Sequence, residues 1–332
     1  MSDKTSTSRR ALLGGIAAAG MAAAVTSGKA IAGSTAIGYS GPSIALWPGK
    51  APGAPARLPV RKVQQQSKDP AFDDRWITGI AAPSLEVRQP AYRDGSAVIL
   101  LPGGGYGFLS WDNEGEEQAR WLTARGVTCF ILSYRLPGEG WTKRETVPLQ
   151  DAQRAVRLVR SRAAEFGIDP KRVAVLGFSA GGHLAGSIAT RFGEQVYAPV
   201  DKADALPARP DLAGMIYPVV SLAQSFTHGG SRDNLLGEGA SGALLQAGSV
   251  ENRVSEDTPP VFLTASSDDG LVPIGNSLAM YGAMLAKQRP VEFHGFDKGG
   301  HGFGARLGGD TPAHIWPDLF HAYGKRHGIF TA

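Results

Sequence analysis

The sequence predicts an α/β domain in which helices cover both faces of a mostly parallel β-sheet. Short apolar runs rich in β-branched residues alternate with helical patterns, and glycine-rich turns follow several of these runs. No repeat or second composition shift divides the chain. The 332 residues are 42% hydrophobic and 19% charged, which excludes collagen, coiled coil and intrinsic disorder and allows one large buried core.

The first 32 residues have the order of an export signal. The pair Arg9-Arg10 precedes an apolar stretch of small residues from Ala11 to Val25, and Ala30–Ala32 then offers a cleavage site. The apolar stretch is too short to cross roughly 30 Å of hydrocarbon. The context of the arginine pair resembles a bacterial twin-arginine signal. We therefore expect an exported mature chain, periplasmic or secreted, that begins near Gly33 and has no membrane contact after cleavage.

Most of the net charge belongs to this segment. The formal net charge of +4 and the isoelectric point near 9.2 taken alone suggest nucleic acid or an anionic surface as a partner. Residues 1–32 carry four basic residues against one acidic residue, and so contribute +3 of the +4. The rest of the chain is close to neutral, and we expect no nucleic-acid partner.

The first predicted elements of the domain are an arm, two strands and a helix between them. Five prolines between residues 42 and 59 exclude a helix or a central strand and predict an extended arm. Ser96–Leu101 and Val127–Tyr134 are apolar runs typical of buried strands. Glu114–Arg125 has a helical pattern, and Gly126 is placed to cap its end.

The clearest helix ends at Phe166, because apolar residues from Ala152 onward recur at steps of three and four and Gly167 follows. We interpret its arginines as a solvated helix face. These are Arg154, Arg157, Arg160 and Arg162.

The remaining elements continue the alternation of strand and helix. Predicted strands lie at Arg172–Leu176, Leu212–Leu222, Val261–Ala265 and Val291–Phe296, and predicted helices at Ala180–Phe192, Ile274–Gln288 and from near Pro317. Residues 223–257 have many glycines and no clear strand. We expect this excursion to cover part of a site at the carboxyl edge of the sheet.

The best candidate for chemistry is Ser179, because residues 177–181 read G-F-S-A-G and match the nucleophile elbow G-x-S-x-G. A predicted strand runs into this pentapeptide and a predicted helix runs out of it, which is the context the motif needs. Small flanking residues let strand and helix approach a serine in strained backbone geometry. The helix N-terminus also favours developing negative charge.

A serine nucleophile needs a general base and an acid that orients the base. His301 is the predicted base, because it lies in a glycine-rich loop just past the last strand. Asp268 and Asp269 follow Val261–Ala265 in one turn, and we favour Asp269 as the orienting acid with Asp268 as the alternative. Structural or surface roles are assigned to His183, His294, His314, His321 and His327.

The run Pro102–Tyr106 ends an earlier strand and exposes consecutive glycine N–H groups that can stabilise an oxyanion. It does not fit a dinucleotide loop, because Phe108 stands where a third glycine is needed, and the chain has no Walker lysine pattern. Cys129, the one cysteine, lies in an apolar strand and predicts neither a disulfide framework nor a cysteine-rich metal site. We therefore expect no cofactor and no metal.

These motifs together resemble α/β-hydrolase-fold esterases of the acetylxylan and feruloyl esterase type, close to the hormone-sensitive-lipase-like group. The resemblance is carried by Leu46–Gly49, Pro102–Tyr106, Tyr134–Pro137, Asp151–Ala155, Gly177–Gly182, Asp269–Pro273 and Gly300–Phe303. It implies that the N–H groups of Gly104, Gly105 and Ala180 donate to the oxyanion. In one departure, Pro102 replaces the usual histidine before the glycines, and the hydrogen bonds with which that histidine braces the loop are lost.

The motifs and the resemblance predict one cofactor-free catalytic domain over residues 33–332. We expect a serine carboxylesterase that cleaves short acyl esters, on carbohydrate of the plant cell wall, through an acyl-enzyme. Tyr106, Trp111 and Trp141 are candidate pocket aromatics, with core positions as the alternative. An amide hydrolase, such as an arylformamidase or a small peptidase, and a non-catalytic binding protein of the same fold stay open. So does the oligomeric state.

Overall fold

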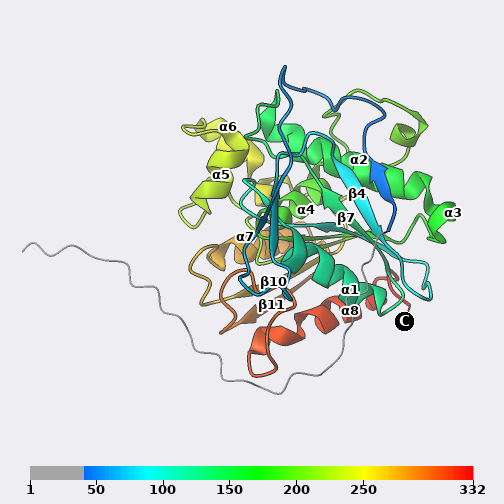
Figure 1. The fold of residues 1–332 in the computed structure, drawn as a ribbon. Helices are drawn as coiled ribbons and strands as arrows, with labels where there is room; N and C mark the ends of the chain where they lie inside the picture. The colour runs from blue at the N-terminus through cyan, green and yellow to red at the C-terminus, as the bar shows by residue number, and fades with distance from the viewer. Residues whose placement is uncertain (1–40, 332) are drawn as a thin grey trace, which may run out of the picture. The chain divides into compact units, whose positions relative to one another are not determined.

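The structure, a computed structural model, describes residues 41–331. The predicted export signal at residues 1–32 lies outside the described residues. An eight-stranded sheet of order β1-β4-β7-β5-β8-β9-β10-β11 forms the centre of the described part (Figure 1). Its strands are β1 (Ser43–Ala45), β4 (Ser84–Arg88), β5 (Ala97–Leu101), β7 (Thr128–Ser133), β8 (Val173–Phe178), β9 (Leu212–Ile216), β10 (Val261–Ser266) and β11 (Val291–Phe296).

In the sheet, β7, β5, β8, β9, β10 and β11 are neighbours in that order and run parallel to one another. At one edge, β4 pairs antiparallel with β7, and β1 pairs antiparallel with β4. β5, β7, β8, β9 and β10 are buried along their whole length, which explains their continuous apolar runs. All the predicted strands are present, although β9 ends at Ile216 rather than at Leu222. The predicted α/β architecture with a mostly parallel sheet is confirmed.

The structure has four short strands where the sequence predicts none: β2, β3, β4 and β6. A small antiparallel sheet of order β2-β3-β6 is formed by β2 (Lys62–Gln65), β3 (Arg75–Thr78) and β6 (Leu109–Ser110). Every residue of β2 is exposed, so this strand has no buried face and no apolar alternation.

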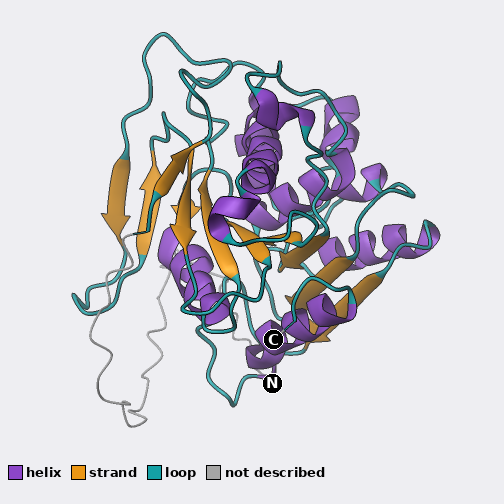
Figure 2. Ribbon diagram, turned by 90° about the vertical axis from the view of Figure 1, so that its right-hand side faces the viewer, coloured by secondary structure: helices purple, strands orange, loops and turns teal. Residues whose placement is uncertain are grey.

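Helices cover both faces of the main sheet (Figures 1 and 2). Neighbouring residues of β9 separate the faces: Phe320 of α8 packs at Gly214, and Gly186 of α4 packs at Met215. One layer contains the π-helical turn η1 (Asp112–Glu116), α1 (Glu117–Thr123) and α8 (Trp316–Arg326). The other contains α2 (Val147–Ser161), α3 (Ala163–Phe166), α4 (Ala180–Arg191) and α7 (Gly275–Ala286). Within residues 41–331, no helix has the length and apolar character needed to span a membrane.

The excursion at residues 223–257 is helical and contains no strand. It folds into α5 (Gly229–Leu236), α6 (Gly242–Gly248) and the short turn η4 (Val250–Arg253), coloured yellow in Figure 1. The other single-turn elements are η2 (Arg144–Thr146), η3 (Lys202–Ala205) and η5 (Pro312–Ile315).

The predicted arm is attached to the domain by a buried polar cluster that we call the anchor cluster: Trp47, Arg135, Asp151 and Arg154. The indole N–H of Trp47 donates to Asp151 (2.8 Å), and Arg154 donates to the carbonyl of Leu46 (2.8 Å). Arg135 and Asp151 form an ion pair with both side chains fully buried. Three motifs of the family resemblance therefore meet in the anchor cluster, where they stabilise the fold: Leu46–Gly49, Tyr134–Pro137 and Asp151–Ala155.

The interpretation of the α2 arginines as a solvated face is wrong for three of the four. Arg154 is 1% exposed and pairs with two aspartates at η3, and Arg157 and Arg160 donate to backbone carbonyls just after η3. Arg162 is partly exposed and pairs with Glu165. The cause is tertiary: the segment that contains η3 folds over this face of α2, and the helical pattern contains no trace of that contact.

Candidate active site

Ser179 lies in the sharp turn between β8 and α4, as predicted. Its backbone angles are φ 53° and ψ −118°, a strained conformation for a residue with a side chain. The two glycines of the motif are required by close approach, because a Cβ on Gly177 would lie 2.0 Å from the carbonyl oxygen of Gly181. A Cβ on Gly181 would in turn lie 2.0 Å from the carbonyl oxygen of Leu101. The G-x-S-x-G pattern thus follows from the packing of strand against helix.

His301 reaches Ser179 from a loop that follows β11. Its Nε2 lies 2.9 Å from the Ser179 hydroxyl, and its Nδ1 lies 2.7 Å from a carboxylate oxygen of Asp269. The flanking Gly300 and Gly302 both have positive φ, which lets the chain turn tightly on each side of the imidazole. Their carbonyls accept hydrogen bonds from Ser266 (2.6 Å) and Asn113 (2.7 Å).

The two adjacent aspartates take different positions. The Asp269 side chain is fully buried, and its second oxygen accepts the N–H groups of Leu271 (2.9 Å) and Val272 (2.8 Å). Asp268 is more exposed and accepts the N–H of Gly300 (2.8 Å). That backbone hydrogen bond holds the pKa of Asp268 below its usual value. The favoured residue, Asp269, is therefore the carboxylate in contact with the imidazole, and Asp268 braces its loop.

The glycine loop after β5 has its carbonyls bound on one side. The carbonyl of Gly103 accepts the N–H of Ser110 (3.0 Å), and that of Gly104 accepts the N–H groups of Gly107 (2.9 Å) and Phe108 (3.2 Å). In a trans peptide the N–H points opposite to the C=O of the same plane. The N–H groups that share these two peptide planes therefore point away from the bonded side of the loop.

Those N–H groups belong to Gly104 and Gly105, two of the predicted oxyanion donors. Within residues 41–331, no protein acceptor binds them or the N–H of Ala180, the third predicted donor, which begins α4. Gly104 and Gly105 line the same cavity as Ser179. The cavity beside Ser179 thus has backbone donors that no protein acceptor occupies among the described residues.

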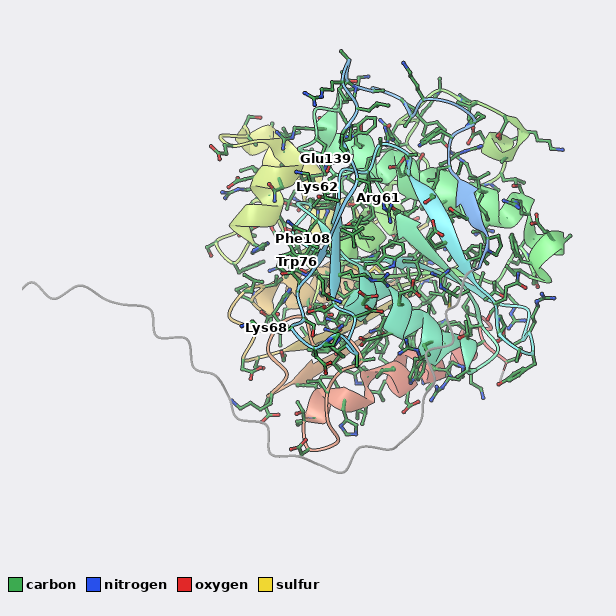
Figure 3. The ribbon with its side chains drawn as sticks, viewed as in Figure 1. Arg61, Lys62, Lys68, Trp76, Phe108 and Glu139 are labelled. Atoms are coloured by element: carbon green, nitrogen blue, oxygen red, sulfur yellow. The ribbon has the colours of Figure 1, made fainter. Side chains whose placement is uncertain are left out.

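A cavity of about 500 Å³ contains Ser179 and His301. One wall is aromatic: Trp76 of β3 and Phe108 stack with ring centroids 3.8 Å apart, and Figure 3 shows them together beside the small sheet. The helical excursion supplies a second wall, as predicted for residues 223–257. Polar side chains that line the cavity are Asp74, Ser110, Asn113, Glu114, His228, Asn234 and Arg306. This volume and mixed lining suit a small polar ligand.

The candidate pocket aromatics are elsewhere, and the core alternative is right. None of Tyr106, Trp111 and Trp141 lines this cavity, and all three are buried. The hydroxyl of Tyr106 donates to His183 (2.8 Å), and the indole N–H of Trp111 donates to Glu116 (3.1 Å). Both side chains are thus used inside the fold.

Sequence reasoning missed Trp76, Glu114 and His228. Burial lowers the pKa of His228, and the nearby His301 lowers it further. Only the expectation that residues 223–257 cover the site could have drawn attention to His228. Trp76 and Glu114 belong to no motif. Within residues 41–331, no three His, Cys, Asp or Glu side chains are grouped to hold a metal ion.

Comparisons with known proteins agree with the resemblance. The profile of the BD-FAE family matches residues 85–284. An acetylxylan esterase of Xylanibacter ruminicola is 35% identical over 219 residues, which are 65% of this chain and 42% of that protein. Endo-1,4-beta-xylanase B of Butyrivibrio fibrisolvens is 35% identical over 205 residues, 62% of this chain and 32% of that protein. The chain thus spans less than half the length of these curated relatives.

A solved structure is similar over nearly its whole length. The acetyl ester-xyloside bifunctional hydrolase of Caldicellulosiruptor lactoaceticus has a TM-score of 0.69 and 34% sequence identity. The alignment covers 88% of this chain and 98% of that chain. The α/β-hydrolase fold is therefore shared along the described domain.

Proposed function

The chain belongs to the BD-FAE family of α/β-hydrolases, and we propose that it is a serine esterase that removes short acyl groups from carbohydrate. One observation carries this proposal: an unbroken chain of hydrogen bonds runs from Asp269 through His301 to Ser179. It supports a nucleophile, a base and an orienting acid in these positions, because each side chain contacts the next at a distance suited to proton transfer.

In the proposed reaction, His301 Nε2 takes the hydroxyl proton while Ser179 Oγ attacks the ester carbonyl carbon. The carbonyl oxygen becomes an oxyanion and accepts the free N–H groups of Gly104, Gly105 and Ala180. The C–O bond to the alcohol breaks, and His301 returns its proton to the leaving oxygen. A water molecule then attacks the acyl carbon while His301 takes one of its protons. The bond from that carbon to Ser179 Oγ breaks, His301 returns the proton to Oγ, and the carboxylic acid is released.

The lining of the cavity supports a carbohydrate ester as the substrate. Sugars combine apolar C–H faces with hydroxyl groups, and the cavity combines the Trp76–Phe108 wall with polar side chains such as Asn234 and Arg306. The acetylxylan esterase and the acetyl ester-xyloside hydrolase among the similar proteins point to the same class. We further propose a single catalytic domain over residues 33–332, exported with its signal removed.

The test is a substrate screen with the purified mature chain. We expect turnover of p-nitrophenyl acetate and butyrate above longer esters, and release of acetate from acetylated xylan. The variant Ser179→Ala should lose at least about 10⁴-fold in kcat. Faster turnover of a formamide or peptide than of any ester would identify an amide hydrolase. Absence of turnover together with absence of labelling by a fluorophosphonate probe would identify a binding protein.

A further inference from the structure

Glu114 is a buried carboxyl group beside the candidate active site that the proposed reaction does not use. It is 3% exposed and lies in the π-helical turn η1. One of its oxygens accepts the N–H of Gly103 (2.7 Å), and the other accepts the hydroxyl of Tyr217 (2.9 Å). Gly103 is the first glycine of the loop whose next two N–H groups face the cavity. π-Helical turns occur often at functional sites.

Tyr217 extends this contact to the opposite side of the site. It follows β9 with a φ of 37°, and its hydroxyl accepts the N–H of Gly304 (3.1 Å). Its ring lies edge-on to the His301 imidazole, with centroids 4.9 Å apart. One carboxylate is therefore bonded directly to the glycine loop and, through one tyrosine, to the loop that carries His301.

The packing around Gly103 leaves no room for a side chain. A Cβ on Gly103 would lie 2.8 Å from the carboxylate of Glu114 and 2.9 Å from Cβ of Ser179. The carbonyl of Pro102, in the peptide plane before Gly103, accepts the hydroxyl of Tyr134 (2.6 Å). This peptide plane is thus held at both ends, by Tyr134 at its C=O and by Glu114 at its N–H.

We propose that Glu114 is a positioning residue: its carboxylate fixes the glycine loop so that the N–H groups of Gly104 and Gly105 point at the carbonyl oxygen of an ester bound to Ser179. This inference rests on the proposed function. It also accounts for Pro102, which replaces the histidine expected to brace the loop. Glu114 supplies the brace from η1 instead.

The bonding pattern specifies a carboxylate rather than an amide. Both partners, the N–H of Gly103 and the hydroxyl of Tyr217, donate, so both oxygens of Glu114 must accept. A glutamine has one acceptor oxygen and would present its NH₂ group to one of these donors. Glu114→Gln therefore conserves the side-chain volume but breaks one of the two links.

The experiment compares Glu114→Gln with Glu139→Gln. Glu139 is a matched control, because its carboxylate also accepts two backbone N–H groups, those of Gly79 (2.5 Å) and Ile80 (3.0 Å). It does not line the cavity, and Figure 3 shows it apart from Trp76 and Phe108. We expect Glu114→Gln to lower kcat for p-nitrophenyl acetate by about 10² with KM changed less than about threefold, because only the oxyanion contacts are misplaced. Glu139→Gln should keep the wild-type kcat.

A second variant tests the link to the His301 loop. Tyr217→Phe should lower kcat less than Glu114→Gln, and the double variant should lose less than the product of the two single losses, because both act through one bond. Wild-type kcat in Glu114→Gln would overturn the proposal, as would a loss that Glu139→Gln shares. The proposed function is tested separately by wild-type turnover and by Ser179→Ala, so the two failures are distinguishable.

Discussion

The candidate active site and the anchor cluster are both polar, but they use their hydrogen-bonding groups in opposite ways. In the anchor cluster, Arg135 donates through all three of its guanidinium nitrogens, to Asp151, Gln150 and a backbone carbonyl. Both oxygens of Asp151 accept hydrogen bonds. At the cavity, the N–H groups of Gly104, Gly105 and Ala180 have no protein acceptor within the described residues.

The difference distinguishes polar groups that stabilise the fold from polar groups that are left available to a ligand. A buried donor without a partner costs free energy, so most buried polar groups in a fold are paired. The anchor cluster follows that rule and closes the arm onto α2. The site differs: Gly104 and Gly105 are partly exposed at the cavity, and the proposed reaction uses their N–H groups and that of Ala180 to bind a substrate oxygen beside a strained serine.

After Ser179→Ala, the largest effect is expected at the orienting acid. Asp269→Asn should lower kcat by about 10⁴, because an amide in contact with Nδ1 of His301 no longer holds the imidazole in the tautomer that accepts the serine proton. The measurement is kcat and KM on p-nitrophenyl acetate, with the melting temperature as a check on folding.

Asp268→Asn is the matched variant for this prediction. Its remaining side-chain oxygen can still accept the N–H of Gly300, so kcat should stay within about tenfold of wild type. Equal losses in the two variants, or a larger loss in Asp268→Asn, would show that the contact between Asp269 and His301 does not define the catalytic acid.

The anchor cluster should respond in stability and not in activity. Asp151→Ala leaves the fully buried guanidinium of Arg135 without its carboxylate, and we expect a loss of about 3–5 kcal/mol in the free energy of unfolding. Denaturant unfolding measures this loss, and kcat at a temperature where the variant is folded should equal that of wild type.

If Asp151→Ala does not fold, a milder change tests the same point. Trp47→Phe removes one hydrogen bond to Asp151 and part of a buried ring, and should cost about 1–3 kcal/mol. A lower kcat in the folded form of either variant would mean that the two regions are coupled and would weaken the comparison.

Much of the site is predictable from sequence because its residues lie at the ends of strands and are flanked by glycines. Ser179 and His301 both lie in such turns, and Asp269 lies in the turn that follows β10. These motifs can be recognised from neighbouring residues alone, without knowledge of contacts to distant segments. The ordering of the parallel strands then brings the three side chains to one edge of the sheet.

The residues that were missed depend on contacts between distant segments. Trp76 comes from a small sheet whose partner strand β2 is fully exposed, and Glu114 has no motif around it. Arg154 was misjudged because residues that follow α4 by some distance fold back over α2. Periodicity describes one helix and contains no information about what packs against it.

The last expected effect concerns His183, which is buried beside the elbow, whereas His301 lines the cavity. Burial lowers the pKa of His183 to about 4, against an ordinary value of 6.5. Its ring accepts the Tyr106 hydroxyl at Nδ1 and donates from Nε2 to the carbonyl of Gly248, a pattern that only the neutral ring satisfies. Between about pH 6.5 and 4 the unfolded chain therefore binds a proton that the folded chain does not.

Stability should consequently fall as the pH falls through this window, by up to about 3 kcal/mol from His183, with no contribution from it above pH 6.5. Denaturant unfolding at pH 7, 5.5 and 4 measures the slope in the wild type and in His183→Gln, which cannot titrate there. The difference between the two curves isolates this histidine from carboxylates that both proteins share. Parallel curves of unfolding free energy against pH for wild type and His183→Gln would show that the buried site of His183 tolerates a charged ring. Burial would then not be what distinguishes His183 from His301.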